Sequence, residues 1–286
     1  MEHEVVVITG GNAGIGKEAA AGLAQAGATV VITSRDRERG ETARAEIVER
    51  AGKDVDVMNL DLASFASVRR FAGDFLDRYD RLDVLLNNAG LILSHRSETE
   101  DGFETTFGVN HLGHFLLTSL LVERLRANDR GARVINVSSV AHKGARDGLD
   151  FDDLQSTKGY AAMPVYSRSK LANIYFTREL ARRLDGDGVT VNALHPGFVR
   201  SEFARGGDTG AFYSIGVRLA SPFAISPKRG ARTSIYLAAS PEVDGVTGEY
   251  FYKRRPAAIS TAARDDDAAR RLWDVSEELV ASAGAD

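Results

Sequence analysis

A tyrosine and a lysine four residues apart stand out in the stretch YSRSK, Tyr166 to Lys170. Residues i and i+4 share one face of a helix, so both side chains can reach the same site. A free tyrosine has a pKa of about 10 and is a poor base at neutral pH, but a neighbouring ammonium group stabilises the phenolate. Such a pair can exchange a proton with a carbonyl or alcohol oxygen. The same spacing also occurs in ordinary amphipathic helices, so the surrounding motifs must decide.

A glycine-rich turn, TGGNAGIG, joins the first apolar run, EVVVITG, to a helix-like stretch. Backbone amides and the helix dipole at such a turn can hold a pyrophosphate, and glycines allow it to approach closely. The turn could also be a tight connection without a ligand, but its early position and its flanking elements favour dinucleotide binding. The cofactor-binding residues expected in it are Gly10, Asn12, Gly14, Ile15 and Gly16.

The end of the second apolar run, VVITSRDRER, bears on the choice between NAD(H) and NADP(H). An NAD site places a carboxylate at the ribose hydroxyls, whereas an NADP site places a cation at the 2′-phosphate. Asp36 lies about 20 residues past the turn, as the acidic residue of NAD sites does, and this leaves NAD(H) open. However, a strand that ends near Thr33 puts Ser34 and Arg35 at the ribose and makes Asp36 the N-cap of the next helix. We therefore favour NADP(H).

The elements that must position these residues follow from an alternation of short β-rich runs and longer helix-like segments. Strands are expected at 4–10, 28–34, 54–60, 82–88, 132–139 and 189–197, with a seventh at 248–252, and helices at 14–27, 36–51, 103–127 and 164–184. Right-handed crossovers place such helices on both faces of a parallel sheet. The sequence therefore predicts an α/β fold, a Rossmann-type doubly wound sheet of about seven strands, in a single domain over residues 1–286.

Two segments interrupt this alternation, near 140–163 and 200–228. Both follow the carboxyl ends of strands, where open α/β sheets bind ligands, so both are candidate substrate loops. The second interleaves glycines with Phe203, Phe212, Tyr213, Ile215, Val217, Leu219 and Phe223. That pattern suits a mobile lid over a lipophilic substrate, and it equally suits a surface helix that packs on the core.

Composition excludes several other classes of function. The net charge is −4 and no long basic run occurs, which argues against a nucleic-acid partner. The chain has no cysteine, so disulfides and thiolate metal sites are excluded and a cytoplasmic location is expected. The acidic N-terminus and its short apolar run predict neither a secretory signal nor a transmembrane segment. His111 and His114 lie three apart on a helix but lack convergent carboxylates, so no metal is expected.

The order of the motifs resembles that of the short-chain dehydrogenases/reductases over nearly the whole chain. The shared motifs are TGGNAGIG, NLDLAS, NNAG, VNHLGHF, NVSS, YSRSK and HPGFVRS. Within this family the chain is most similar to the retinol-dehydrogenase-like branch, through VNHLGHFLLT, VSSVAH, YSRSKLAN, TRELARRL, HPGFVRSEF and RRLWDVSEEL. The resemblance implies a reaction at a CH–OH or C=O carbon of a small molecule, with hydride exchanged with NADP(H).

The resemblance also implies a role for each catalytic position. Tyr166 would donate or accept the proton, and Lys170 would hold the nicotinamide ribose and lower the tyrosine pKa. Ser139 would hydrogen-bond the substrate oxygen, with its neighbour Ser138 as the alternative. Asn110 would position a water linked to Lys170 and so continue the proton relay.

Further positions would surround the cofactor by the same resemblance. Those near the adenine and the nucleotide side of the sheet are Asp61, Leu62, Asn88, Ala89 and Gly90, and those bordering the nicotinamide are Pro196, Gly197, Val199 and Ser201. The helices at 103–127 and 164–184 resemble those that pair subunits, which implies a homodimer or homotetramer. Two alternatives remain: a C=C reductase on the same scaffold, and a nucleotide-sensing protein without turnover, which the intact tyrosine, lysine and serine disfavour.

Overall fold

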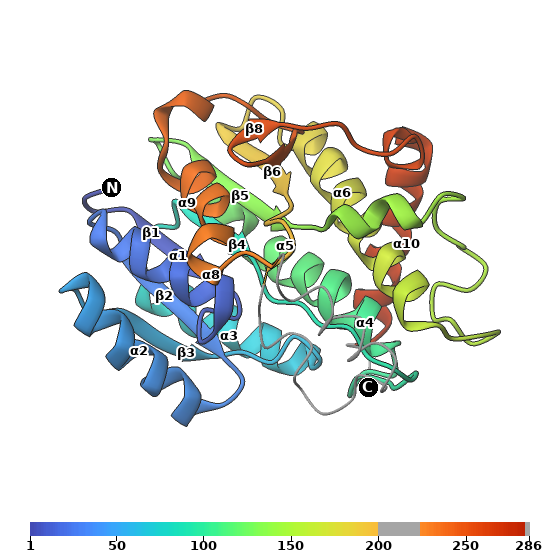
Figure 1. Ribbon diagram of the computed structural model, residues 1–286, viewed down its shortest axis with the longest axis horizontal. Coiled ribbons are helices and arrows are strands. Elements are labelled where there is room, and N and C mark those ends of the chain that lie inside the picture. The colour runs from blue at the N-terminus through green and yellow to red at the C-terminus, as the bar shows by residue number, and fades with distance from the viewer. Residues whose placement is uncertain (200–223, 284–286) are drawn as a thin grey trace.

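Eight strands form one sheet in the computed structural model, which describes residues 1–199 and 224–283 (Figure 1). Their order across the sheet is β3-β2-β1-β4-β5-β6-β7-β8, and every neighbouring pair is parallel except β7 and β8. The strands are β1 (Val5–Ile8), β2 (Thr29–Ser34), β3 (Asp56–Asn59), β4 (Val84–Asn87), β5 (Ala132–Val137), β6 (Val189–Leu194), β7 (Tyr250–Tyr252) and β8 (Arg255–Pro256). The predicted doubly wound sheet is confirmed, and β8 adds a short antiparallel edge.

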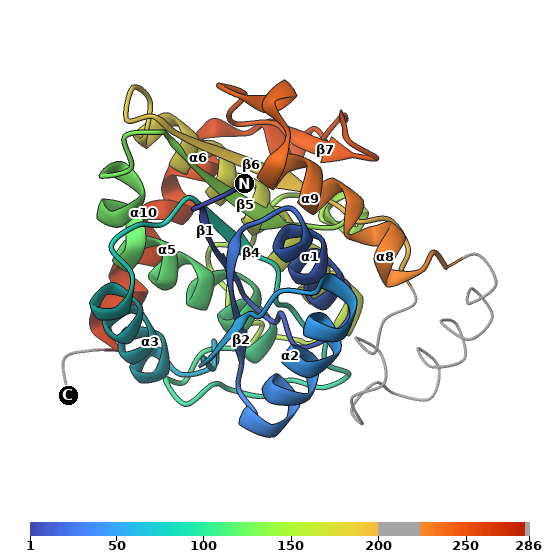
Figure 2. The same ribbon diagram turned by 90° about the vertical axis from the view of Figure 1, so that its left-hand side faces the viewer.

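Helices cover both faces because the strand side chains alternate between two apolar layers. Val6 and Ile8 pack with α1 and α9, whereas Val5 and Val7 pack with α3 and α5. Figure 2 shows α1, α2, α8 and α9 on one side of the strands and α3, α5 and α10 on the other. The helices are α1 (Gly14–Gln25), α2 (Arg37–Ala51), α3 (Phe65–Arg78), α4 (Thr105–Phe107), α5 (Gly113–Arg126), α6 (Ala162–Arg183), α8 (Pro227–Gly230), α9 (Arg232–Ala239) and α10 (Asp266–Ser282).

The long helix expected at 103–127 is interrupted. A π-helical turn, Gly108–Leu112, separates α4 from α5 and holds Asn110 at its centre. A single wide turn of this kind leaves the apolar pattern of the helix nearly intact, so periodicity does not reveal it. Such turns occur frequently at functional sites.

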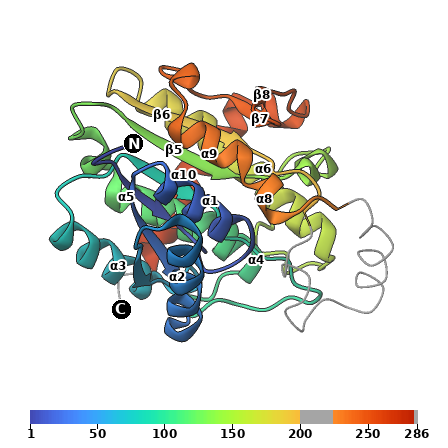
Figure 3. The same ribbon diagram turned by 60° about the vertical axis from the view of Figure 1, so that its left-hand side comes forward.

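The first candidate substrate loop begins with a 3-10 helix, Val140–Gly144, and continues without regular structure to α6. Most of the second loop, including the apolar residues from 203 to 223, lies outside the described residues. Its last residues lead into α8, which packs against α1, and α9 follows beside it (Figure 3). The structure therefore tests neither interpretation of that apolar pattern.

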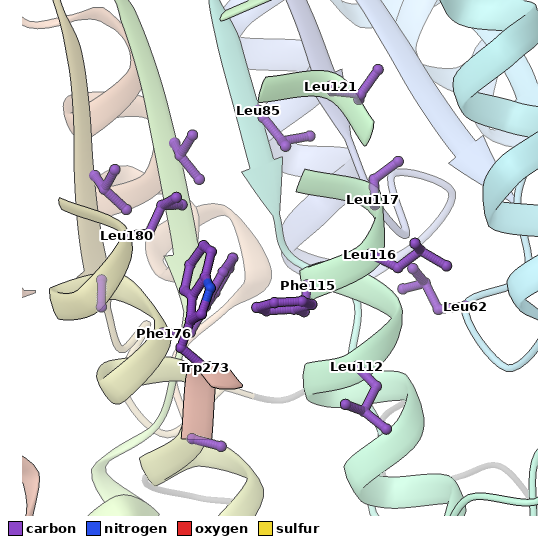
Figure 4. Packing of buried hydrophobic residues seen from close by; sticks show 14 of the residues in the cluster. Leu62, Leu85, Leu112, Phe115, Leu116, Leu117, Leu121, Phe176, Leu180 and Trp273 are labelled. Atoms are coloured by element: carbon purple, nitrogen blue, oxygen red, sulfur yellow. The ribbon is translucent and has the colours of Figure 1, made fainter. Parts of the chain in front are cut away.

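Helix α10 packs along α6, and its Trp273 also contacts Phe115 of α5 (Figure 4). The Trp273 ring lies 4.9 Å from that of Phe115 and 6.0 Å from that of Phe176, centroid to centroid. All three side chains are buried, and the Arg183 guanidinium lies 4.4 Å above the indole ring. A tryptophan seated among aromatic rings contributes a large buried apolar area, so α10 is an integral part of the core.

Candidate active site

Four neighbouring strands direct their carboxyl ends toward one edge of the sheet. Thr9 and Gly10 follow β1, Asn88 follows β4, Ser139 follows β5 and Pro196 follows β6. Because β1, β4, β5 and β6 are adjacent and parallel, these segments meet at the same edge. Helix α6 crosses beside this edge, and its first turns carry the tyrosine and lysine of YSRSK.

Lys170 is buried, with 3% of its surface exposed. Its Nζ donates to the carbonyl oxygen of Val137 at 3.1 Å and lies 5.6 Å from the centroid of the Tyr166 ring. Burial lowers the pKa of Lys170 to about 8. An ammonium group this close to a phenol stabilises the phenolate, so the geometry supports proton exchange at Tyr166.

The two adjacent serines differ in what their hydroxyl groups contact. Ser138 is buried and its Oγ donates to the Lys170 carbonyl oxygen at 2.7 Å. Ser139 is half-buried, and its Oγ accepts from the Ala141 amide at 3.1 Å. Within the described residues no acceptor takes the Ser139 hydroxyl hydrogen. Ser139 can therefore donate to a substrate oxygen, whereas Ser138 anchors α6 to the end of β5.

Asn110 is fully buried and all its side-chain donors are used. Its Oδ1 accepts from the Leu91 amide at 2.8 Å, and its Nδ2 donates to the Leu91 carbonyl and to Ser169 Oγ, both at 2.9 Å. A Cβ added to Gly90 would lie 3.1 Å from both Asn110 Oδ1 and Lys170 Nζ. The structure therefore brings Asn110 and Lys170 to one point beside Gly90, where any larger residue would press on both.

The glycine loop has the close contacts that a phosphate turn requires. A Cβ on Gly16 would lie 2.4 Å from the Gly10 carbonyl oxygen and 2.6 Å from Asn88 Nδ2, so only glycine fits there. Helix α1 begins at Gly14, and its first backbone hydrogen bond is donated by Lys17 to Ala13. The amide of Ile15 and its neighbours before Lys17 have no helical acceptor within the described residues and can bind an anion, as expected at a helix N-terminus. Asn12 lies within the same turn.

At the end of β2 the structure agrees with the capping role expected of Asp36. Its Oδ1 accepts from the Arg39 amide at 3.1 Å at the start of α2. Ser34 Oγ donates to the Asp36 carbonyl at 2.6 Å, and the Arg35 side chain is exposed. The Asp36 carboxylate thus caps α2, and the Arg35 guanidinium lies at the carboxyl end of β2.

The remaining predicted cofactor residues lie around this edge in different environments. Asp61 Oδ1 accepts from the Ala63 amide at 2.9 Å, as in a turn, and Leu62 is buried against Gly113 of α5. Asn88 joins the end of β4 to the end of β1, because its Nδ2 donates to the Thr9 carbonyl at 2.9 Å. Ala89 lies beside Gly10, where an added Cβ would be 3.1 Å from the alanine Cβ.

The segment after β6 turns sharply at Gly197, whose φ is +93° and whose amide donates to His195 Nδ1 at 3.2 Å. Pro196 precedes this turn. Val199 pairs with Ile225 and packs on Gly230 of α8, where a Cβ would lie 2.8 Å from its Cγ2. Ser201 lies outside the described residues.

A cluster of rings beside Tyr166 was not predicted from the sequence. The His195 ring stacks on Tyr252 at 4.1 Å and on Tyr250 at 5.7 Å, and His142 meets Tyr250 edge-on at 5.1 Å, centroid to centroid. Burial, with a smaller effect of the nearby Tyr166, raises the pKa of Tyr250. His142 Nδ1 contacts the Ser139 carbonyl at 2.7 Å, so this ring cluster also touches the main chain of Ser139. The motifs HPG and GEYFY were its only signals in the sequence.

The two histidines of the VNHLGHF motif do not converge on a common point. His111 Nε2 contacts Ser276 Oγ at 2.8 Å, and His114 Nε2 contacts Thr9 Oγ1 at 2.9 Å. In the described part of the chain, no three His, Cys, Asp or Glu side chains gather closely enough to hold a metal ion. None of the described helices is long and apolar enough to cross a membrane.

A doubly wound sheet with a glycine phosphate turn and a Tyr-Lys pair at its carboxyl edge defines a nicotinamide-dependent oxidoreductase. A family model described as enoyl-(acyl carrier protein) reductase matches residues 10–253. Retinol dehydrogenase 12 of Homo sapiens is 49% identical over 281 residues, covering 98% of this chain and 87% of the relative. Retinol dehydrogenase 14 of Mus musculus is 46% identical, covering 98% and 86%. The chain belongs to the short-chain dehydrogenase/reductase family, and within it to the retinol-dehydrogenase-like branch.

Solved structures agree with this assignment. A putative uncharacterized protein from Mycobacterium paratuberculosis superposes with a TM-score of 0.79 at 37% identity, covering 98% of this chain and 94% of that one. The Pseudomonas aeruginosa RhlG/NADP active-site complex gives a TM-score of 0.69 at 29% identity, covering 88% and 94%. The predicted family is therefore confirmed by sequence and by fold.

Proposed function

We propose that this oxidoreductase uses NADP(H) to interconvert a lipophilic aldehyde or ketone and its alcohol, with Tyr166 transferring the proton. The observation that carries the proposal is the placement of Tyr166 beside the buried Lys170, at the edge where the Ser139 hydroxyl hydrogen has no acceptor among residues 1–199 and 224–283. A bound nicotinamide would supply or accept the hydride. Side chains at this edge would bind the substrate oxygen and transfer the proton.

In the reductive direction the carbonyl oxygen accepts hydrogen bonds from Ser139 and Tyr166. Negative charge develops on that oxygen as the carbon is reduced, and donors already in place stabilise it. Tyr166 then gives up its proton, which the ammonium group of Lys170 favours by stabilising the phenolate. Asn110 would complete the relay through a water linked to Lys170. In the oxidative direction the Tyr166 phenolate takes the proton of the alcohol.

The preference for NADP(H) over NAD(H) rests on the residues after β2. The Asp36 carboxylate is engaged by the Arg39 amide, and Arg35 is exposed at the carboxyl end of the strand. A guanidinium there can bind a 2′-phosphate with paired hydrogen bonds. The P. aeruginosa relative, 29% identical, was solved as an NADP active-site complex.

The lipophilic substrate is supported by exposed apolar side chains around the site. Val140, Met163 and Phe198 are 51%, 43% and 49% exposed. They lie next to Ser139, three residues before Tyr166 and next to Gly197, respectively. Isolated apolar side chains on a surface are ordinary, but three around one catalytic edge suit a substrate with apolar bulk. The names of the retinol dehydrogenases point the same way, so retinaldehyde is the first substrate to test.

Purified protein with NADPH and a panel of aldehydes and ketones tests the proposal through the loss of nicotinamide absorbance. Tyr166→Phe should reduce turnover by a factor of about 100 or more, as the removal of a general acid does. Turnover that survives this substitution would contradict the mechanism. Product analysis separates the proposal from C=C reduction, because an unsaturated aldehyde gives the alcohol in one case and the saturated aldehyde in the other.

We propose a cytoplasmic enzyme, which the lack of cysteine in the sequence supports. Pairing through α5 and α6, as a homodimer or homotetramer, must accommodate α10, which packs along α6 and contacts α5 through Trp273 and Phe115. A partner subunit would use the faces that α10 leaves uncovered, and light scattering of the full chain measures the outcome.

A further inference from the structure

His114 stands in the first turn of α5, just after the π-helical turn, and only 3% of its surface is exposed. Both ring nitrogens have a partner. Nε2 lies 2.9 Å from Thr9 Oγ1, at the end of β1, and Nδ1 lies 3.3 Å from the Asn110 carbonyl oxygen. One imidazole therefore touches the segment that carries the glycine loop and the segment that carries the relay asparagine.

The partners of Thr9 determine where the imidazole proton lies. Thr9 Oγ1 accepts from the amides of Asn88 at 2.8 Å and Ala89 at 2.9 Å, so both of its lone pairs are occupied. Its hydroxyl hydrogen therefore goes to His114 Nε2 at 2.9 Å, which is closer than the Leu86 carbonyl at 3.5 Å. Nε2 is then an acceptor, and Nδ1 must carry the hydrogen that the Asn110 carbonyl accepts.

The hydrogen bonds continue from Asn110 to the catalytic tyrosine. Asn110 Nδ2 donates to Ser169 Oγ at 2.9 Å, and Ser169 Oγ donates to the Tyr166 carbonyl at 2.8 Å. Thr9, Asn110 and Ser169 are each at most 1% exposed. Each hydroxyl of this hydrogen-bonded network has one preferred acceptor, and the loss of His114 would leave the Thr9 hydroxyl only the longer contact to the Leu86 carbonyl at 3.5 Å.

We propose that His114, as the neutral Nδ1–H tautomer, is a positioning residue that links the cofactor loop to the Asn110–Tyr166 relay. The inference rests on the proposed function for the role of those two residues. Burial, with a smaller contribution from Lys170, lowers the pKa of His114 to about 3, so the ring stays neutral at physiological pH. Through Thr9 it fixes the turn at Asn88 that faces the glycine loop, and through its Nδ1–H it fixes the main chain of Asn110.

Two substitutions separate the two halves of this link. The side-chain amide of His114→Asn can replace the Nδ1–H donor but removes the acceptor for Thr9, so the NADPH dissociation constant should rise about tenfold while kcat at saturating NADPH changes about threefold or less. In His114→Gln the amide oxygen can reach Thr9 but the donor to Asn110 is lost, so kcat should fall about tenfold with little change in NADPH affinity. Equal effects of both variants on both parameters would overturn the proposal.

His111→Leu is the matched control. His111 is also buried, lies three residues earlier and is bonded to Ser276 on α10, outside the network. It should lower stability without raising the NADPH dissociation constant. A rise as large as that of His114→Asn would mean that any loosening of this segment weakens cofactor binding, and the specific link would be refuted.

The tautomer is measured without cofactor or turnover. Long-range ¹H–¹⁵N spectra of the full chain labelled at its six histidines distinguish the two neutral forms and the imidazolium, and His114→Gln identifies the His114 signals. A neutral Nδ1–H ring at pH 7 is expected; an Nε2–H ring or an imidazolium would overturn the proposal. If the wild type shows this tautomer but reduces no carbonyl, the proposed function fails and the link stands. If the wild type reduces carbonyls normally but His114 is the Nε2–H tautomer, the proposed function stands and the His114 link fails.

Discussion

Replacing Lys170 with methionine should stabilise the folded chain while it abolishes activity. Burial lowers the pKa of Lys170 from 10.5 to about 8. A base with a depressed folded pKa binds fewer protons in the folded state than in the unfolded state between those two values. Its charge therefore destabilises the fold fully below pH 8, and the penalty fades as pH rises to 10.5.

The size of the effect follows from the same shift. Each pKa unit corresponds to about 1.4 kcal/mol, so the buried charge costs about 3 kcal/mol at pH 7. Methionine keeps the apolar stem but loses the bond to the Val137 carbonyl, which still accepts from Asn173 Nδ2 at 3.2 Å. With about 1 kcal/mol deducted for that bond, Lys170→Met should raise the free energy of unfolding by about 2 kcal/mol.

Urea unfolding at pH 7 and pH 10.5, followed by circular dichroism, measures this difference. The stabilisation should be present at pH 7 and absent at pH 10.5. Lys53→Met removes an exposed lysine and should change the free energy of unfolding by less than about 0.5 kcal/mol at either pH. A Lys170→Met variant that is less stable than the wild type at pH 7, or whose difference is independent of pH, would refute the reasoning.

Three further predictions concern the site and its surroundings. Arg35→Ala should raise the dissociation constant of NADPH at least tenfold more than that of NADH in fluorescence titrations, by loss of about 1.4 kcal/mol or more of charge-assisted bonding; equal losses would remove the NADP assignment. Ser139→Ala should lower kcat about 100-fold, whereas Ser138→Ala should mainly lower thermal stability, and the reverse pattern would exchange their roles. Burial lowers the pKa of His111 to about 3, so its neutral form stabilises the fold above pH 6.5 and this contribution is lost as pH falls. Between pH 7 and pH 5 the loss should be about 2 kcal/mol smaller in His111→Leu than in the wild type, and an equal loss would show that His111 is protonated in the fold.

The sheet, and the position of the predicted site residues at its carboxyl edge, could be predicted because many of their signals are local. Asp36 shows why: an acidic residue at a strand–helix junction has one favourable bond close by, to the amide three residues on, and the structure shows it. The glycines of TGGNAGIG are similar, since close approach of the backbone excludes other residues. The order of the motifs along the chain then predicted that Ser139, Tyr166 and Lys170 meet at one edge of the sheet.

What could not be predicted depends on partners far away in the sequence. His114 binds Thr9, and His142 Nε2 accepts from the Ser260 amide at 3.2 Å, contacts that span more than a hundred residues. The hydrophobic periodicity of a sequence indicates local secondary structure and does not reveal contacts between distant residues. The π-helical turn at Asn110 and the packing of α10 on α5 also depend on the assembled core, because the local sequence is compatible with a continuous helix.

The position of α10 late in the chain has a consequence for synthesis. The rings of Phe115 and Phe176 are covered by Trp273, which is made roughly a hundred residues after α5 and α6 are largely complete. At translation rates of about 5–20 residues per second, these two rings stay uncovered by Trp273 for about 5–20 seconds on every new chain. Chains stalled before Asp266 should therefore bind hydrophobic dyes and recruit chaperones, and release of the complete helix should end both.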